Sequence, residues 1–216
     1  MLVRDLMTPD PICGRPDMVV TEIQKLMSDS GIRHVPIVDE ADKLVGLVTQ
    51  RSLFGALRTE ESDLSQFEVS YILAKIQAQH VMVEDVITIE EDVPVEEAAR
   101  VMADKRIGCL PVMRGNDLVG IITDNDLFNT MLNLLGARRH GVRLAVLQPD
   151  RTGEVARLTS AVAKEGGYLS VCVGYHPEGM PDSWVSVLKV SNLSEEELVT
   201  IIDNLEEVEI RDMRKV

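Results

Sequence analysis

One phrase occurs twice in this chain, and its repetition limits what the chain can fold into more than any other feature. GLVTQRSL at residues 46–53 and GIITDNDL at residues 120–127 share a glycine, two aliphatic residues, a threonine and a final leucine. Upstream of the phrase the same kind of match continues at an offset of 75 residues, where Met7 aligns with Met82. A fixed offset over roughly 50 positions indicates a duplicated structural unit.

Each unit is predicted to contain the same elements: an extended piece, an amphipathic helix, a buried strand, a polar turn, a second buried strand and a second helix. The first unit supplies PICG, VVTEIQKLMSDS, HVPIVD, LVGLVT and RSLFGAL, and the second supplies VITI, PVEEAARVMADK, CLPVM, LVGIIT and NDLFNTML. Neither unit alone buries much core, so we expect the two pseudo-symmetric copies to pack sheet to sheet. Four methionines are expected to fill this core: Met7, Met27, Met82 and Met102.

The chain on either side of the second unit has a different pattern. Residues 61–80 are expected to form a polar loop and then a helix from Gln66 onward, because apolar residues follow helical spacing there. Residues 136–141, GARRHG, contain two glycines and are predicted to be a linker. Residues 142–216 then predict strand, helix, strand, strand, helix and strand, with Ser194 capping the second helix. This βαββαβ order is a ferredoxin-like arrangement.

Charge and cysteine usage exclude several classes of protein. A net charge of −14 argues against non-specific binding to nucleic acid or to an anionic membrane. Cys13, Cys109 and Cys172 form no CxxC pair, which favours a reducing compartment, and the four histidines show no metal-ligand spacing. No apolar run approaches the roughly 20 residues of a membrane span. We therefore expect a cytoplasmic protein without a metal.

These sequence patterns resemble those of two known protein families. Residues 1–60 and 81–135 resemble a tandem pair of CBS domains through IRHVPIVD…LVGLVT and IGCLPVM…LVGIITDNDL. Residues 142–216 resemble an ACT domain through the strand order and the PDRTGEV turn. With FEVSYILAKI between the CBS units, the combination is similar to the acetoin-utilisation AcuB-type proteins. The resemblance implies an α/β (α+β) fold, namely a CBS pair packed as a Bateman module followed by an ACT domain.

The resemblance also implies a function. The resemblance to CBS pairs implies a regulatory, ligand-sensing role. It also implies that an adenosine-containing ligand (AMP, ADP, ATP or S-adenosylmethionine) is held in the cleft between the units. ACT domains imply amino-acid binding or dimerisation, so the expected partners are this small molecule, a second copy in a homodimer, and an unidentified regulated protein. No cofactor is expected beyond the adenine nucleotide as regulatory ligand. The alternatives are a constitutive dimerisation scaffold with vestigial sites and an amino-acid sensor. An enzyme is not expected, because the sequence offers no nucleophile–base pair, metal cluster or P-loop.

The second copy of the repeated phrase has the chemistry of a nucleotide site. Thr123 lies where a strand becomes a helix, and the unpaired N–H groups of a helix start can bind phosphate. Asp126 lies one turn further, where a carboxylate can accept hydrogen bonds from both ribose hydroxyls. The alternative is a capping box, in which the same carboxylate serves only its own helix.

The resemblance places the other repeat around Asp126. It implies that Ile12 and Ile32 contact the adenine and that Arg33 and His34 edge the main cleft. Arg33 is the stronger candidate for phosphate, because its charge is permanent and its donors form a fork. The alternative is a surface arginine and a partly buried histidine that stabilise a loop.

The first copy carries Ser52 in place of the aspartate, so we expect its cleft to hold ribose weakly or differently. Arg51 beside Ser52 adds a cation that could favour a more phosphorylated ligand, or is a solvated surface residue. The residues expected around this second cleft are Thr49, Arg51, Ser52, Ile87, Ile107, Gly108 and Cys109.

The ACT-like segment departs from its pattern at two positions. The first turn carries Thr152 where ligand-binding members have proline, and Leu169 stands where they have a polar asparagine. A free effector could still meet the backbone at a turn made of Asp150, Thr152, Gly153 and Glu154. The alternative is an ordinary strand-to-helix turn, with assembly as the role of this domain.

Overall fold

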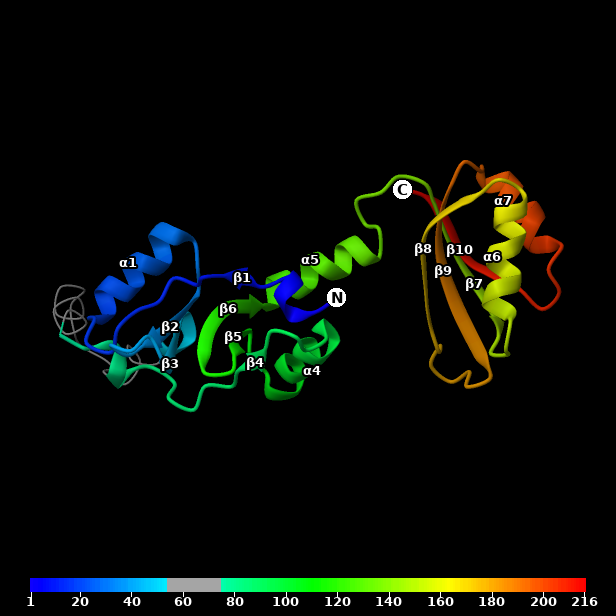
Figure 1. Ribbon diagram of the computed structural model, residues 1–216. Coiled ribbons are helices and arrows are strands. Elements are labelled where there is room, and N and C mark those ends of the chain that lie inside the picture. The colour runs from blue at the N-terminus through cyan, green and yellow to red at the C-terminus, as the bar shows by residue number, and fades with distance from the viewer. Residues whose placement is uncertain (54–74) are drawn as a thin grey trace, which may run out of the picture. The chain divides into compact units, whose positions relative to one another are not determined.

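The computed structural model describes residues 1–53 and 75–216, and the chain divides into two compact units, Met1–Phe128 and Asn129–Val216 (Figure 1). Most of the helix predicted from Gln66 onward lies outside the described residues. So does most of the helix predicted for RSLFGAL, of which Arg51 to Leu53 are described and helical. Just before the second repeat the described chain forms a short 3-10 turn, η2 (Ala78–His80).

The first repeat builds a helix over a two-stranded hairpin. Helix α1 (Val20–Ser30) buries Val20, Ile23 and Met27, the side that helical spacing places on one face. It ends at Gly31, whose φ of 64° is in the left-handed region that glycine adopts without a steric penalty. The chain then enters β2 (His34–Val38), which pairs antiparallel with β3 (Leu44–Thr49).

The second repeat reproduces this arrangement. Helix α4 (Val95–Lys105) buries Val95, Ala98 and Met102 against β5 (Cys109–Arg114) and β6 (Asp117–Thr123). A short strand, β4 (Ile89–Glu90), adds parallel to β5, and α5 (Asp124–Leu134) follows β6 without a loop. The predicted order of elements in this repeat is confirmed.

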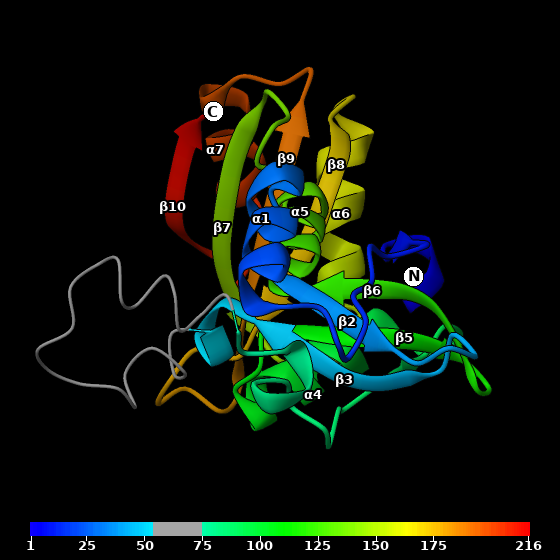
Figure 2. The same ribbon diagram turned by 90° about the vertical axis from the view of Figure 1, so that its left-hand side faces the viewer.

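The two repeats exchange their first residues. Strand β1 (Thr8–Pro9) pairs with β6, so that Thr8 lies opposite Ile121, and the turn η1 (Val3–Asp5) before it packs into the core of the second repeat. At the matching position of the second repeat, Val83 forms a bridge to Leu47 of β3. Figure 2 shows β2 and β3 beside β5 and β6, where a small cluster of Leu47, Cys109, Ile121 and Val86 joins the repeats. The expected sheet-to-sheet packing is therefore supplemented by an exchange of strands.

The paired glycines of the repeated phrase make this exchange fit. A Cβ on Gly120 would lie 2.5 Å from Met7 Sδ and 3.0 Å from the Thr8 carbonyl oxygen. Gly46 is approached in the same way by Met82. Met27 and Met102 are buried in the two cores, so the expectation that the four methionines pack the interior is confirmed.

The C-terminal unit has the predicted βαββαβ order. Its elements are β7 (Val142–Pro149), α6 (Glu154–Lys164), β8 (Tyr168–Tyr175), β9 (Ser183–Ser191), α7 (Glu195–Asp203) and β10 (Glu209–Lys215). The strands lie in the order β10-β7-β9-β8, all antiparallel, and both helices cover one face of the sheet (Figure 1). The Ser194 hydroxyl accepts a hydrogen bond from the Glu197 backbone N–H, which confirms the predicted cap.

The segment predicted as a linker is hydrogen-bonded to this sheet. The Lys189 ammonium, on the sheet face opposite the helices, is buried and donates to the Gly136 carbonyl at 2.6 Å. Gly141 and Val216 exchange two backbone hydrogen bonds of 3.0 and 2.9 Å. Residues 136–141 are therefore part of the C-terminal unit and lie against its sheet.

Candidate functional site

A cavity of about 280 Å³ lies between the two repeats. Its walls come from β1 and the residues after it, from the connection between α1 and β2, and from the junction of β6 with α5. The lining residues are Thr8, Asp10, Pro11, Ile12, Gly31, Ile32, Arg33, His34, Ile121, Thr123, Asn125 and Asp126. All six residues that the sequence assigned to the main cleft are among them, and they come from three separate stretches of the chain.

The left-handed turn at Gly31 sets the direction of one wall. Gly31 ends α1, and the Ile32 N–H closes the turn by donating to the Met27 carbonyl at 2.9 Å. The chain after this turn forms part of the cavity wall, through Ile32, Arg33 and the start of β2. Ile12, from the segment after β1, adds an apolar side chain that is 43% exposed. The two isoleucines give the cavity part of its apolar surface.

Asp126 caps its own helix. Its Oδ2 accepts hydrogen bonds from the Thr123 N–H and the Thr123 hydroxyl, both at 2.8 Å. The alternative capping role is therefore present in this structure. A carboxylate has about four acceptor positions, so capping and ligand binding are compatible in one side chain.

The start of α5 is not an open phosphate site. Besides the Thr123 N–H, the Asp124 N–H donates to the Gly108 carbonyl, and the Asn125 N–H donates to the Asp124 carboxylate at 2.8 Å. Asp124 and Asp126 also place two negative charges in the first turn, where they complement the positive end of the helix. The prediction of unpaired N–H groups at this helix start is therefore wrong, because the chain's own groups accept from those of Thr123, Asp124 and Asn125. Phosphate binding there stays a prediction.

Arg33 has a partner that the sequence analysis missed. Its guanidinium lies 3.6 Å from the Asp124 carboxylate, with both side chains about half exposed. Gly108 borders this ion pair, and a Cβ there would lie at an ordinary contact distance of 3.4 Å from Asp124 Oδ2. Asp124 stands where the first repeat has Gln50. This charge difference between the copies could have indicated the partner.

His34 lies beside this ion pair and is partly buried. Burial lowers the pKa of the imidazole below its usual value, the Arg33 cation lowers it further, and Asp124 acts in the opposite direction. His34 is therefore mostly neutral near pH 7 and can serve as a hydrogen-bond donor or acceptor to a ligand.

The residues predicted for the second cleft, next to Ser52, lie in different environments. Thr49 and Ser52 form a capping box like that of Thr123 and Asp126: the Ser52 N–H donates to the Thr49 hydroxyl at 3.1 Å, and Ser52 Oγ accepts from the Thr49 N–H at 2.9 Å. Arg51 and Ile87 are exposed, and Ile107 packs against the second core.

Cys109 lies inside the contact between the repeats and is 3% exposed. Burial, and secondarily the Asp124 carboxylate, raises the pKa of the Cys109 thiol to about 12. Gly108, next to it, lies near Asp124 and His34. These two positions of the expected second cleft are therefore occupied by packing within the protein.

The effector turn of the C-terminal unit is built around an ion-pair network. Gly153 caps α6 with a φ of 93°, a conformation that favours glycine. The Glu154 carboxylate lies 2.5 Å from Arg157 and 3.2 Å from Arg151, and the Arg157 hydrogen bond holds the pKa of Glu154 below its usual value. Thr152 is exposed, and Asp150 lies 3.8 Å from His176. Glu154 thus already has cationic partners within the chain.

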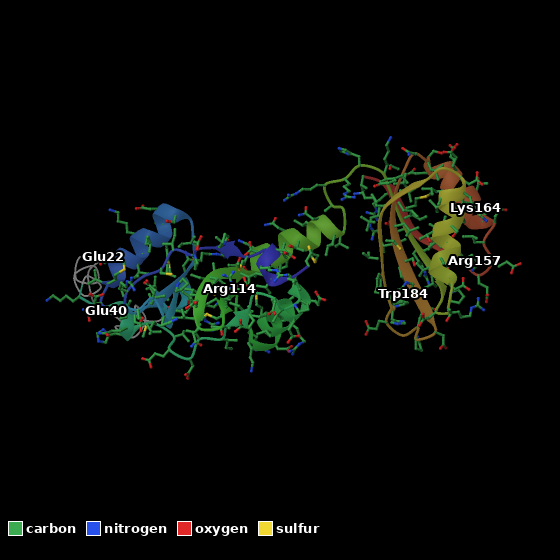
Figure 3. All side chains as sticks on the ribbon, in the orientation of Figure 1. Glu22, Glu40, Arg114, Arg157, Lys164 and Trp184 are labelled. Carbon is green, nitrogen blue, oxygen red and sulfur yellow. The ribbon has the colours of Figure 1, made fainter. Side chains whose placement is uncertain are left out.

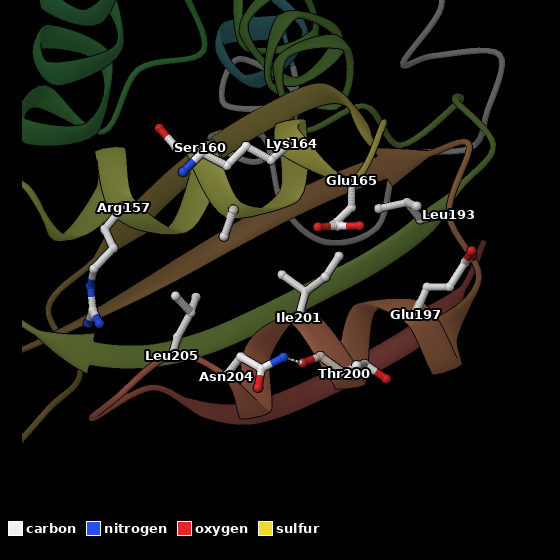
Figure 4. Close-up of a pocket in the computed structure, with 11 residues that line it drawn as sticks. Arg157, Ser160, Lys164, Glu165, Leu193, Glu197, Thr200, Ile201, Asn204 and Leu205 are labelled. Carbon is white, nitrogen blue, oxygen red and sulfur yellow. Dashed lines mark hydrogen bonds between the residues drawn. The ribbon is translucent and has the colours of Figure 1, made fainter.

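A larger hollow of about 560 Å³ lies between α6 and α7 (Figure 4). Leu193, Ile201 and Leu205 give it an apolar side, and Arg157 and Lys164 extend from α6 beside it (Figure 3). None of the residues predicted from sequence for the effector turn lines this hollow.

Among residues 1–53 and 75–216, no group of three or more His, Cys, Asp or Glu side chains is arranged to hold a metal ion. Over the same residues, no helix is long and apolar enough to cross a membrane.

The duplicated fold and the cavity at its centre are those of a CBS pair. The CBS-domain family model matches residues 3–59 and 78–133, which is more than half of the chain, and the chain therefore belongs to the CBS-domain family.

Curated relatives match mainly the CBS pair. An uncharacterized protein of Methanopyrus kandleri, MK0525, is 34% identical over 55% of this chain and 56% of its own length. The L-aspartate semialdehyde sulfurtransferase of Methanocaldococcus jannaschii is 31% identical over 58% of this chain but only 22% of its own length. The chain thus spans between about a fifth and about a half of these relatives, and the enzyme's name belongs to a much longer protein.

Similar solved structures also match the CBS pair of this chain. A candidate acetoin utilization protein (AcuB) from Vibrio cholerae is 36% identical, with a TM-score of 0.53 over 64% of this chain and 95% of that one. The CBS pair of protein MJ0100, in complex with 5′-methylthioadenosine and S-adenosyl-L-methionine, is 30% identical, with a TM-score of 0.53 over 64% of this chain and 98% of that one. CBSX2 in complex with AMP is 25% identical, with a TM-score of 0.51 over 61% of this chain and 96% of that one. Similar CBS pairs therefore bind adenosine-containing molecules.

Proposed function

We propose that this protein is a non-catalytic regulatory protein that binds an adenosine-containing ligand in the cavity between its CBS repeats. One observation carries the proposal: the six residues expected to hold such a ligand, which are far apart in sequence, line a single cavity. The complexes of MJ0100 and CBSX2 support the choice of ligand class.

Each part of an adenosine has a partner in this cavity. Ile12 and Ile32 offer apolar contacts to the base, and Asp126 offers a carboxylate to the two ribose hydroxyls. Arg33 and His34 lie at the edge, where the 5′ substituent is expected. Because the walls belong to both repeats, ligand binding would stabilise one arrangement of the repeats over another, which is what regulation requires.

The signal is proposed to pass through a homodimer to a regulated protein, with the ACT-like C-terminal unit serving assembly. The Vibrio cholerae relative makes acetoin utilization the pathway to examine first. The second candidate is a constitutive dimerisation scaffold with vestigial sites. It is favoured by the residues expected around the second cleft, where Ser52 of the first repeat caps its helix without a carboxylate and Cys109 of the second repeat is buried.

Asp126→Ser is the substitution that tests the proposal. It gives the second repeat the Thr–Ser cap that the first repeat already uses, so the fold is retained while the carboxylate is lost. Loss of charge-assisted bonds worth about 1.5–3 kcal/mol should raise the Kd for an adenosine ligand about 10- to 150-fold. Isothermal titration calorimetry with 5′-methylthioadenosine, S-adenosylmethionine, AMP and ATP measures this directly.

Asp29→Ser, on the exposed surface of α1, is the matched control and should bind like the wild type. Unchanged affinity in Asp126→Ser would remove the assignment of Asp126. If the wild type binds none of the four compounds while remaining folded and dimeric, the scaffold is the better description.

A further inference from the structure

We infer that the cavity selects adenosine compounds whose 5′ substituent is uncharged or cationic and discriminates against nucleoside di- and triphosphates. This inference rests on the proposed function and names the ligand class within it. It follows from the arrangement of charges around the cavity, which differs from the phosphate-binding arrangement expected from the sequence.

The permanent charges that line the cavity have a negative sum. Asp10 and Asp126 contribute two carboxylates, and Arg33 contributes one guanidinium. Arg33 is already paired with a third carboxylate, Asp124, at 3.6 Å. His34 adds a positive charge only when it is protonated. A phosphate at the edge of the cavity would therefore compete with Asp124 for Arg33 and would approach Asp10 and Asp126.

The backbone offers no compensating anion site at the start of α5. The N–H groups of Thr123, Asp124 and Asn125 donate to Asp126, to the Gly108 carbonyl and to Asp124 itself. A phosphate could bind there only by displacing these groups. The side-chain carboxylates already provide the negative charge that a helix start favours.

Size points in the same direction as charge. The cavity of about 280 Å³ is at the small end of the roughly 300–1,000 Å³ range of ligand pockets. It suits a nucleoside with a compact 5′ group better than a nucleoside with an extended triphosphate. The net charge of the chain, −14, adds a long-range repulsion that a tetra-anion feels more strongly than a neutral or cationic ligand.

The ligands that fit share adenosine and differ at the 5′ carbon. A thioether, as in 5′-methylthioadenosine, carries no charge there, and the sulfonium of S-adenosylmethionine carries a positive charge that Asp10 and Asp126 would attract. AMP is an intermediate case, and ATP is the least favourable. Beside Asp126, two carboxylates set this preference: Asp10 lines the cavity, and Asp124 pairs with Arg33.

Calorimetry on the full chain tests the preference with 5′-methylthioadenosine, S-adenosylmethionine, AMP and ATP at low and at physiological ionic strength. The first two compounds should bind at least about tenfold more tightly than ATP, and the difference should shrink as salt screens the charges. ATP binding as tightly as 5′-methylthioadenosine would overturn the inference while leaving the proposed function intact. Binding of none of the compounds would overturn both.

Two charge-removing variants locate the origin of the preference. Asp10→Asn suits the left-handed φ of 47° at this position, which asparagine tolerates. Asp124→Asn keeps an oxygen for the Asn125 N–H and releases Arg33. Each should bring the affinity for ATP closer to that for 5′-methylthioadenosine, whereas Asp29→Asn on the surface of α1 should change neither affinity. If neither Asp10→Asn nor Asp124→Asn alters the ratio of the two affinities, the assignment to these carboxylates is wrong.

Discussion

Ser52 and Asp126 occupy equivalent places in the two repeats and make the same type of local contact. Each caps a helix through the threonine three residues before it, Thr49 or Thr123. The cap is therefore common to both copies, and the carboxylate is the difference between them. A residue that is kept only for capping would not need a charge, because serine performs the same task in the first repeat.

Ser52→Asp should create a second ribose acceptor without disturbing the helix cap. We expect the number of adenosine ligands bound per chain to rise from one toward two, with weaker binding at the new site because Gly108 and Cys109 replace Arg33 and His34. Calorimetric stoichiometry with 5′-methylthioadenosine is the measurement, and Ser52→Asn, of similar size but uncharged, is the control. One ligand per chain in all three proteins would show that the first repeat lacks a cleft as well as a carboxylate.

At the scale of elements, the exchange of β1 onto β6 holds one wall of the cavity in place. Thr8, which pairs with Ile121, lines the cavity, and Met7 before it fills the space above Gly120. The repeated glycine is thus explained by the close approach of the other repeat's first strand. Gly120 contributes to the site by allowing β1 to lie close to β6.

Gly120→Ala should destabilise the CBS pair by about 1–3 kcal/mol, because the added methyl group overpacks the crossing of β1 and β6. Met7 Sδ can move, but the Thr8 carbonyl at 3.0 Å belongs to the backbone, so relaxation would displace β1. Denaturant unfolding measures the loss. Gly108→Ala is the matched control, because its Cβ would meet its nearest atom at an ordinary 3.4 Å. Equal stability of the two variants would show that β1 is not tightly held.

At the scale of the whole molecule, the two edges of the C-terminal sheet differ in charge. Strand β10 carries Glu209, Arg211, Asp212, Arg214 and Lys215, whereas β8, YLSVCVGY, carries no charged residue. Uncharged edge strands are sites of pairing with another chain, and charged edges resist it. Two copies of β8 could pair antiparallel about a two-fold axis, which joins identical surfaces without bringing like charges together.

We therefore predict a homodimer that depends on β8. Light scattering at micromolar concentration should give twice the mass of the chain for the wild type, and Val173→Lys should shift the mass toward that of a monomer because lysines oppose each other across the new edge. Thr152→Lys, at an exposed turn outside β8, should remain dimeric. A dimer that survives Val173→Lys would place the interface elsewhere, and a monomeric wild type would refute the prediction.

The sequence by itself determined the duplicated CBS fold, the order of elements in both units and the residues gathered at the cavity. The fold and the order of elements follow from local patterns: the 75-residue offset, the short apolar strands, the helical spacing of Val20, Ile23 and Met27, and the cap at Ser194. The cavity residues were expected from the resemblance to CBS pairs. Hydrophobic periodicity and helix capping depend on residues only a few positions apart. The elements of each repeat can therefore be predicted without knowing which other segments pack against them.

Tertiary structure decided which charges meet and which side chains are covered. Arg33 pairs with Asp124 of the other repeat, Cys109 is enclosed by Leu47 and Ile121, and Gly136 lies against Lys189. Each of these contacts joins residues that are distant in the chain, and its energy depends on separation and burial in space, which no local pattern encodes. For that reason the sequence predicted an adenosine site without choosing between AMP, ADP, ATP and S-adenosylmethionine. The charges that the fold brings together are the basis of our inference that the ligand carries little negative charge.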